Sequence, residues 1–139
     1  MPVSEMRDGG YHRFRFAVMP YTGENLPSVL EAAAVLNSAT PAFRVPAGTS
    51  AWHSGFALSE PGASIEAIKS QFVGEGLALR VVEQLGQART VAVTIPPHFT
   101  HARLSNLLED PEHELAVQGG QVQVPVRAFG IHTLLLDSE

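Results

Sequence analysis

The sequence contains no cysteine, and this absence excludes several kinds of chemistry at once. There is no thiol nucleophile, no thiolate metal site and no disulfide framework. A chain of 139 residues can bury about two-thirds of its unfolded surface, so it needs no such cross-links to fold. The lack of cysteine also fits a cytoplasmic location, which we expect for this protein.

Charged residues are scarce as well, at 17% against about 25% in typical soluble chains. Two explanations stay open: part of the surface is apolar and covered by a partner or by self-association, or the chain is a compact β domain rich in Ser, Thr and Gln. The nine Lys and Arg residues are scattered and the net charge is −5, so we expect no nucleic-acid partner and no membrane partner. The sequence also lacks a transmembrane apolar run and a secretory signal.

What the sequence does contain is alternating apolar residues, most clearly in the stretch Gly76–Ile95. Side chains at 77, 79 and 81, and again at 91, 93 and 95, share one parity. Because successive strand side chains point to opposite faces, each strand offers one apolar row to a core. Gly86 lies between them and supplies the positive φ that a hairpin loop needs. This pattern predicts two antiparallel strands joined by a short connection.

Turn residues recur about every 8 to 12 positions over the C-terminal half, the spacing of a sandwich or barrel. Gly119-Gly120 predicts a two-residue hairpin that sets Val117 opposite Val122 and Leu115 opposite Val124. The last strand is apolar on both parities, so we expect it to be central in its sheet. The further predicted strands are Gly55–Glu60, Ser64–Phe72, His101–Leu108, Glu114–Gln118, Gln121–Val126 and Phe129–Leu136.

The N-terminal part reads differently. Tyr11–Met19 alternates as a strand, and Ser28 with Glu31 has the form of a capping box before a helix over Val29–Asn37. A helix this short is marginal alone, so we expect it to dock, most simply on that strand. A second short strand is predicted at Phe43–Val45.

These elements predict a mainly β fold, an antiparallel β-sandwich with one short helix near the N-terminus. Proline and glycine between residues 46 and 50 mark a boundary. Residues 1–46 hold too few strands for a core of their own, so we interpret them as the C-terminal remnant of a larger β-sandwich. Residues 47–139 are predicted to form a small antiparallel β-sandwich domain.

Short motifs follow one another in order along the chain. They are Tyr11–Pro20 with Gly23, then Ala34, Leu36, Asn37 and Pro41, then Gly74-Glu-Gly76-Leu77-x-Leu79-Arg80-Val81-x-Glu83, Leu104-Ser-Asn-Leu107-Leu108-Glu109 and Phe129-x-Ile131-x-Thr133-Leu134. This ordered series resembles the C-terminal β region of glycoside hydrolase family 38, the α-mannosidases. Two residues depart from the family pattern: Tyr21 stands where the family usually has His, and Val82 stands where it often has Tyr.

The resemblance implies that zinc, the nucleophilic Asp and the acid/base carboxylate belong to an N-terminal α/β catalytic domain, which no part of this sequence resembles. The chain is then expected to be a non-catalytic β-sandwich portion of an enzyme that hydrolyses α-mannosides. It would pack against the catalytic domain and border the substrate cleft. No cofactor is expected in the chain itself.

Carboxylates and histidines are the residues of this sequence that could act as catalytic or metal-binding groups. Glu109, Asp110, Glu112 and Glu114 cluster in a Pro-containing turn, which favours a solvated loop with ordinary carboxylates over a Ca²⁺ site or a catalytic pair. Glu83 ends a strand, so its carboxylate is expected to reach water in a structural role.

The histidines offer little more. His98 and His101 have a metal-like spacing, but in a strand an offset of three points them apart. His12, His53, His113 and His132 are expected at the surface or an interface.

Two aromatic residues are the candidates for sugar contact. Trp52 lies at the predicted boundary, where its indole face could stack on a sugar or plug the gap between two β units. Tyr21 lies in the loop before the helix. Together they support a second hypothesis, a stand-alone carbohydrate-binding β module. A third is an Ig-like interaction domain unrelated to sugars.

Overall fold

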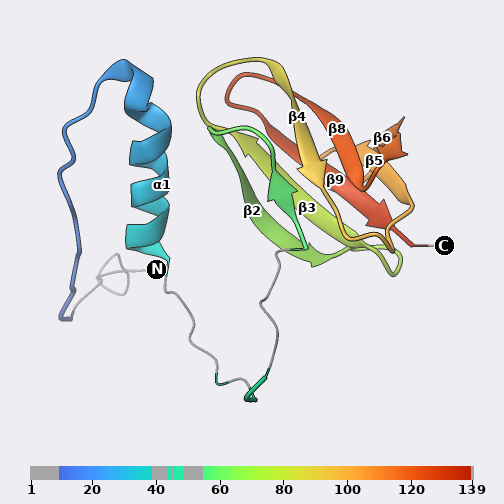
Figure 1. Ribbon diagram of the computed structural model, residues 1–139, viewed down its shortest axis with the longest axis horizontal. Helices are drawn as coiled ribbons and strands as arrows, with labels where there is room; N and C mark the ends of the chain where they lie inside the picture. The colour runs from blue at the N-terminus through green and yellow to red at the C-terminus, as the bar shows by residue number, and fades with distance from the viewer. Residues whose placement is uncertain (1–9, 39–43, 45, 49–54, 139) are drawn as a thin grey trace, which may run out of the picture.

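The computed structural model describes residues 10–38, 44, 46–48 and 55–138 (Figure 1). A single 3₁₀ turn, Gly23–Asn25, leads into helix α1, Leu26–Asn37. None of the described helices has the length and hydropathy for a membrane crossing. The strands are β1 Ala57–Leu58, β2 Ala63–Ser70, β3 Leu77–Glu83, β4 Arg89–Thr94, β5 His101–Ser105, β6 Pro111–Leu115, β7 Val117–Gln118, β8 Gln121–Val126 and β9 Ile131–Asp137.

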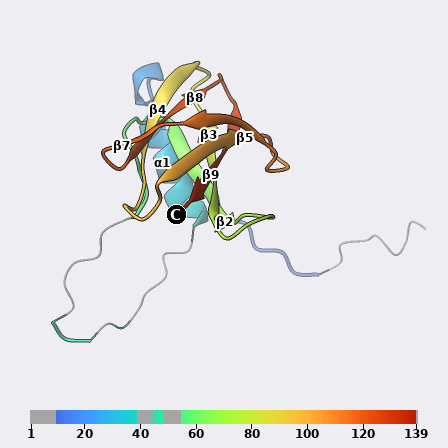
Figure 2. The same cartoon turned by 90° about the vertical axis from the view of Figure 1, so that its right-hand side faces the viewer.

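The strands form two antiparallel sheets packed face to face (Figures 1 and 2). One sheet has the order β1-β4-β8-β7 and the other the order β2-β3-β9-β5-β6. The alternating rows predicted from the sequence supply the core between them, with a residue parity that matches the pleat. The fold is therefore the predicted antiparallel β-sandwich with one short helix. The buried core consists of Leu79, Val81, Val91, Val93, Ile95, Phe99, Ala102, Val122, Val124, Val126, Leu134 and Leu136.

The central pair of strands is correct, but the predicted hairpin between them is wrong. β3 pairs with β2 and β9, whereas β4 pairs with β1 and β8 in the opposite sheet. Residues 84–88 carry the chain from one layer to the other, and Gly86 in this connection has φ +74°. Alternation fixes which face of a strand is buried, but two rows can meet across a sandwich as well as side by side.

β9 is central, as its apolar residues on both parities predict. It lies between β3 and β5, and residues 132–136 are buried. The β7–β8 hairpin also has the predicted register, with Val117 opposite Val122. Leu115, however, pairs with Ala102 in the other sheet instead of facing Val124. The predicted strand at residues 114–118 is divided at Ala116, where the chain passes between the sheets.

β5 ends at Ser105, three residues before the predicted end, and the Leu108 side chain is exposed. The Asn106 side chain causes this early end. Its Oδ1 accepts hydrogen bonds from the backbone N–H groups of Leu108 at 2.8 Å and Asp110 at 3.0 Å. Such a side-chain-to-backbone turn competes with strand pairing.

Helix α1 ends at Asn37 as predicted but begins at Leu26. Pro27 lies in its first turn, where a residue without an N–H is tolerated. The predicted capping box is wrong, because Ser28 lies inside the helix and Asn25 precedes it without a side-chain cap bond.

Residues 11–19 form no strand, which corrects the prediction for this segment. A strand needs a partner for its backbone groups, and none of the described strands pairs with this segment, which lies on the far side of α1 from the sandwich (Figure 1). Ala17, Val18 and Met19 line a hollow with α1, so the helix does lie against this segment. Phe43 and Val45 lie outside the described residues, and the division of the chain near residues 46–50 stays a prediction.

Candidate functional site

The two predicted sugar contacts are not seen together. Tyr21 lies before α1 with its side chain 55% exposed. Trp52 lies outside the described residues, so a joint site with Tyr21 stays a prediction.

Glu83 is the most enclosed carboxylate of the described chain, with its side chain wholly inaccessible to solvent. The prediction that it reaches water is wrong because two loops close over it. Its Oε1 accepts from the N–H of Leu85 at 3.0 Å, and its Oε2 accepts from Gly86 at 2.8 Å, Gln87 at 3.1 Å and Phe129 at 3.1 Å. Glu83 thus has the predicted structural role, but as a buried residue that binds the backbone of the surrounding loops.

This arrangement holds Glu83 as a carboxylate. Burial by itself would raise the pKa, but the N–H groups that point at the two oxygens outweigh it and lower the pKa below its ordinary value. Arg89 adds a cation, with Nη2 at 3.4 Å from Oε1. A general acid needs a raised pKa and access to substrate, and Glu83 has neither. Its chemistry is to tie the ends of three chain segments together.

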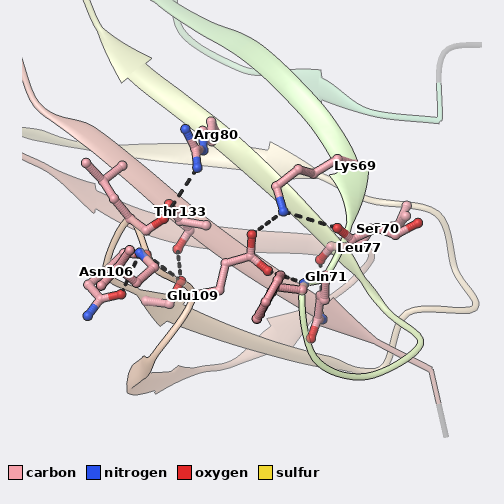
Figure 3. Close-up of polar contacts among 12 residues, drawn as sticks. Lys69, Ser70, Gln71, Leu77, Arg80, Asn106, Glu109 and Thr133 are labelled. Atoms are coloured by element: carbon pink, nitrogen blue, oxygen red, sulfur yellow. Dashed lines mark hydrogen bonds and ion pairs between the residues drawn. The ribbon is translucent and has the colours of Figure 1, made fainter.

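Glu109 is the second carboxylate with a defined role (Figure 3). It lies in the β5–β6 loop at φ +69° and accepts from the Phe72 N–H at 2.6 Å, while Lys69 forms an ion pair with its other oxygen. The hydrogen bond from Lys69 and that from Phe72 lower the pKa of Glu109. The prediction that Glu109 carries a solvated carboxylate is therefore wrong, because its side chain is only 8% exposed. Asp110, Glu112 and Glu114 are exposed as predicted.

Glu83 and Glu109 cannot work as a glycosidase pair. Glu83 ends β3, whereas Glu109 binds near the opposite end of that strand. It contacts Phe72 in the β2–β3 loop and Lys69, which pairs with Ala78 near the start of β3. The two ends of β3 are six residues apart, which corresponds to roughly 20 Å at about 3.3 Å per residue. A retaining glycosidase needs its two carboxyl groups about 5–5.5 Å apart. Both carboxylates hold loops in place.

The histidines are scattered, and no group of three potential metal ligands occurs among the described residues. His98 and His101 are exposed, as is His113. His132 contradicts its predicted surface position: it is buried on β9, and its Nε2 accepts from the Arg127 N–H at 2.9 Å. Burial lowers its pKa, and the charge of Arg127 adds to this effect. His53 lies outside the described residues.

One surface feature was not found from the sequence. Phe72, Val73, Leu107, Leu108 and Ile131 are large apolar residues that are 51–85% exposed, and we call them the outer apolar patch. Phe72 and Val73 line a hollow of about 420 Å³ together with Leu108. Leu108 also lines a second hollow of about 750 Å³, together with Leu107 and Ile131. Because Leu108 belongs to both hollows, the patch is continuous. Loops supply four of the five residues, and strand periodicity cannot reveal an exposed row in loops.

Comparison with protein families places this architecture among known domains. A family model described as glycosyl hydrolases family 38 C-terminal beta sandwich domain matches residues 62–134, more than half of the chain. The matched residues run from the start of β2 into β9 and include Glu83 and Glu109. Among curated proteins, none matches this chain.

Proposed function

Because the chain belongs to the family 38 C-terminal β-sandwich domains of the glycosyl hydrolases, we propose that it is the structural C-terminal portion of an α-mannosidase. The domain is a non-catalytic part of a family 38 glycosidase. In this proposal it packs against the catalytic domain and borders the substrate cleft. The match over residues 62–134 is the observation that carries the proposal.

The described carboxylates agree with a supporting role. The carboxylate oxygens of Glu83 and Glu109 accept hydrogen bonds from backbone N–H groups and form ion pairs with Arg89 and Lys69. Neither is free to protonate a leaving group or attack a sugar. We assign zinc and the catalytic carboxylates to the catalytic domain, outside this chain.

The outer apolar patch is the surface that we assign to the contact with the catalytic domain. Contiguous exposed apolar side chains mark interaction sites on soluble proteins. Leu108, 79% exposed, lies where its two hollows meet, so it is the residue to test. Its loop is held by the Glu109 carboxylate, which keeps the patch in a fixed shape before any partner arrives.

The first experiment measures activity. The purified chain is incubated with an aryl α-mannoside, and we expect no product release above the buffer rate. Release at an enzyme-like rate would refute the supporting role.

The second experiment measures association. The chain is co-expressed with the catalytic part of the enzyme from the same source, and we expect the two to co-purify in equal amounts. Leu108→Asp should weaken this complex at least tenfold. Val35→Asp, which places the same charge on an exposed apolar residue of α1, should leave it unchanged. Equal effects of the two variants would remove the outer apolar patch from the interface.

A carbohydrate-binding module is the second candidate, favoured by the exposed Tyr21 ring. A sugar face can stack on such a ring in the way aromatic rings pack on apolar surfaces. Calorimetry with mannose and manno-oligosaccharides tests it. Heat that saturates at millimolar sugar and is lost in Tyr21→Ala or Trp52→Ala supports the module, and no heat removes it.

A further inference from the structure

Residues 11–19 form the most exposed apolar segment of the described chain. Phe14 and Phe16 are 81% and 87% exposed, and Val18 is 89% exposed. These three share one parity with His12, whose ring stacks on that of Phe14 at 6.2 Å between centroids. Arg13 and Arg15 lie at the alternate positions. The segment thus carries the period of two that belongs to a strand, with an apolar side and a cationic side.

The backbone of residues 13–19 is also open. Residues 13–19 exchange no backbone hydrogen bond with any other described residue. The segment's contact with α1 is through Ala17, Val18 and Met19, which line a hollow with that helix. A chain with strand periodicity and free N–H and C=O groups is a template for pairing with another strand.

The charges indicate which strand it fits. Among the described residues, neither Arg13 nor Arg15 forms an ion pair. Two copies of the segment paired antiparallel about Phe14 would set Arg13 of one opposite Arg15 of the other. Like charges directly opposite in a sheet are destabilising, whereas opposite charges placed there are stabilising. A second copy is therefore a poor partner in this register, whereas a strand with carboxylates at the facing positions complements both arginines.

We propose that residues 11–19 add as an edge strand to a sheet of another polypeptide, and that the receiving strand alternates carboxylate and apolar side chains. The carboxylates face Arg13 and Arg15, and the apolar side chains face Phe14 and Phe16. Backbone hydrogen bonds supply affinity, and the alternating side chains supply register and selectivity. This surface lies outside residues 62–134 and does not depend on the function proposed for the sandwich.

The test uses the whole chain and two synthetic ten-residue peptides, one alternating Glu with Val and the other alternating Lys with Val. Amide hydrogen exchange is followed residue by residue by NMR at low ionic strength. The Glu-Val peptide should slow exchange at residues 12–18 at least tenfold when it saturates, and the Lys-Val peptide should leave it unchanged. In the double variant Arg13→Glu/Arg15→Glu the preference should reverse.

A matched control is Arg7→Glu/Arg44→Glu, which changes the net charge equally outside the segment and should keep the preference for the Glu-Val peptide. Four outcomes overturn the proposal. They are slow exchange at residues 12–18 in the free dilute chain, slow exchange that depends only on chain concentration, no effect of either peptide, and an effect that survives charge reversal. The second outcome would show that copies of the chain pair with each other.

Discussion

Glu83 joins segments that are far apart in the chain. It ends β3, and it holds the connection at residues 85–87 and the turn at Phe129 before β9. Phe129 has φ +53°, a strained conformation for a bulky residue that its hydrogen bond to Glu83 helps to maintain. One carboxylate therefore fixes where the chain crosses between the sheets.

We expect Glu83→Gln to lower the free energy of unfolding by about 3 kcal/mol. The amide keeps the size of the side chain but replaces one accepting oxygen with an NH₂ donor that faces N–H groups, and it leaves Arg89 without its anion. Removing one partner from a buried charged network typically costs about 3–5 kcal/mol. Urea unfolding at pH 7 measures the loss. Glu60→Gln, at an exposed position, is the control and should change stability by less than about 0.5 kcal/mol.

His132 makes stability depend on pH below neutrality. Its pKa in the folded chain lies below the ordinary value of 6.5, so in mildly acidic solution the unfolded chain binds a proton that the folded chain does not. Stability is therefore fully present above pH 6.5 and falls as the pH drops through the folded pKa, by at most about 1.4 kcal/mol per pH unit.

Urea unfolding at pH 7.5, 6.5 and 5.5 measures this slope. His132→Gln should remove most of it, and His101→Gln, at an exposed position, should keep it. If both variants show the same dependence of stability on pH as the unmodified chain, His132 is not the source of that dependence.

At the scale of elements, Gly76 sets how closely β3 and β9 approach. Just before β3, it lies against the carbonyl of Leu136, and a Cβ there would overlap that oxygen and the Gln71 side chain. Gln71 is itself committed, because its Nε2 donates to Leu136 O at 3.1 Å and to Asp137 Oδ1 at 2.9 Å. The neighbours therefore cannot move aside cheaply.

We expect Gly76→Ala to destabilise the sandwich by about 3 kcal/mol, the upper range for forced overpacking. Gly23→Ala is the matched control: a Cβ there meets nothing within 4 Å, so the change in stability should stay below about 0.5 kcal/mol. Thermal unfolding compares the two variants. Equal melting temperatures would mean that β9 shifts to accept the methyl group.

The sequence predicts the strands of this fold well and their partners poorly. The rows at Leu79–Val81 and Val91–Val93 are buried as their parity requires, and the Gly119-Gly120 turn fixes its own register. Local chemistry decides these features. The crossing between β3 and β4 depends on a buried carboxylate receiving an N–H from Phe129, 46 residues away. No local pattern encodes such a contact, so Glu83 was expected at the surface.

The same limit applies to the site. Glu109 looked like one of four solvated acids because its partners, Lys69 and Phe72, come from another part of the sequence. The outer apolar patch arises only when the loops after β2 and β5 meet. By contrast, the family resemblance rests on short motifs in order, which need no knowledge of contacts. It was confirmed over residues 62–134.

At the scale of the whole molecule, the sandwich and the N-terminal part differ in kind. Every residue of the buried core lies between Leu79 and Leu136. Phe56, just before β1, and Leu58, on β1, pack against it. Helix α1 has no buried residue. A hollow of about 390 Å³ lies between α1 and the start of β2, and none of the residues that line it is buried. The physical argument for two units is thus that, in the part of the chain that the structure describes, only the sandwich has a core.

We therefore expect a chain that starts at Gly55 to fold with an unfolding free energy within about 1 kcal/mol of the full chain, because none of the described residues before Gly55 is buried. A chain that starts at Pro61 also loses Phe56 and Leu58, and should be less stable by about 2 kcal/mol, since these side chains are partly buried. Urea unfolding of the three chains measures both differences. A large loss on removing residues 1–54 alone would mean that part of this segment belongs to the folding unit, and the division into two parts would be wrong.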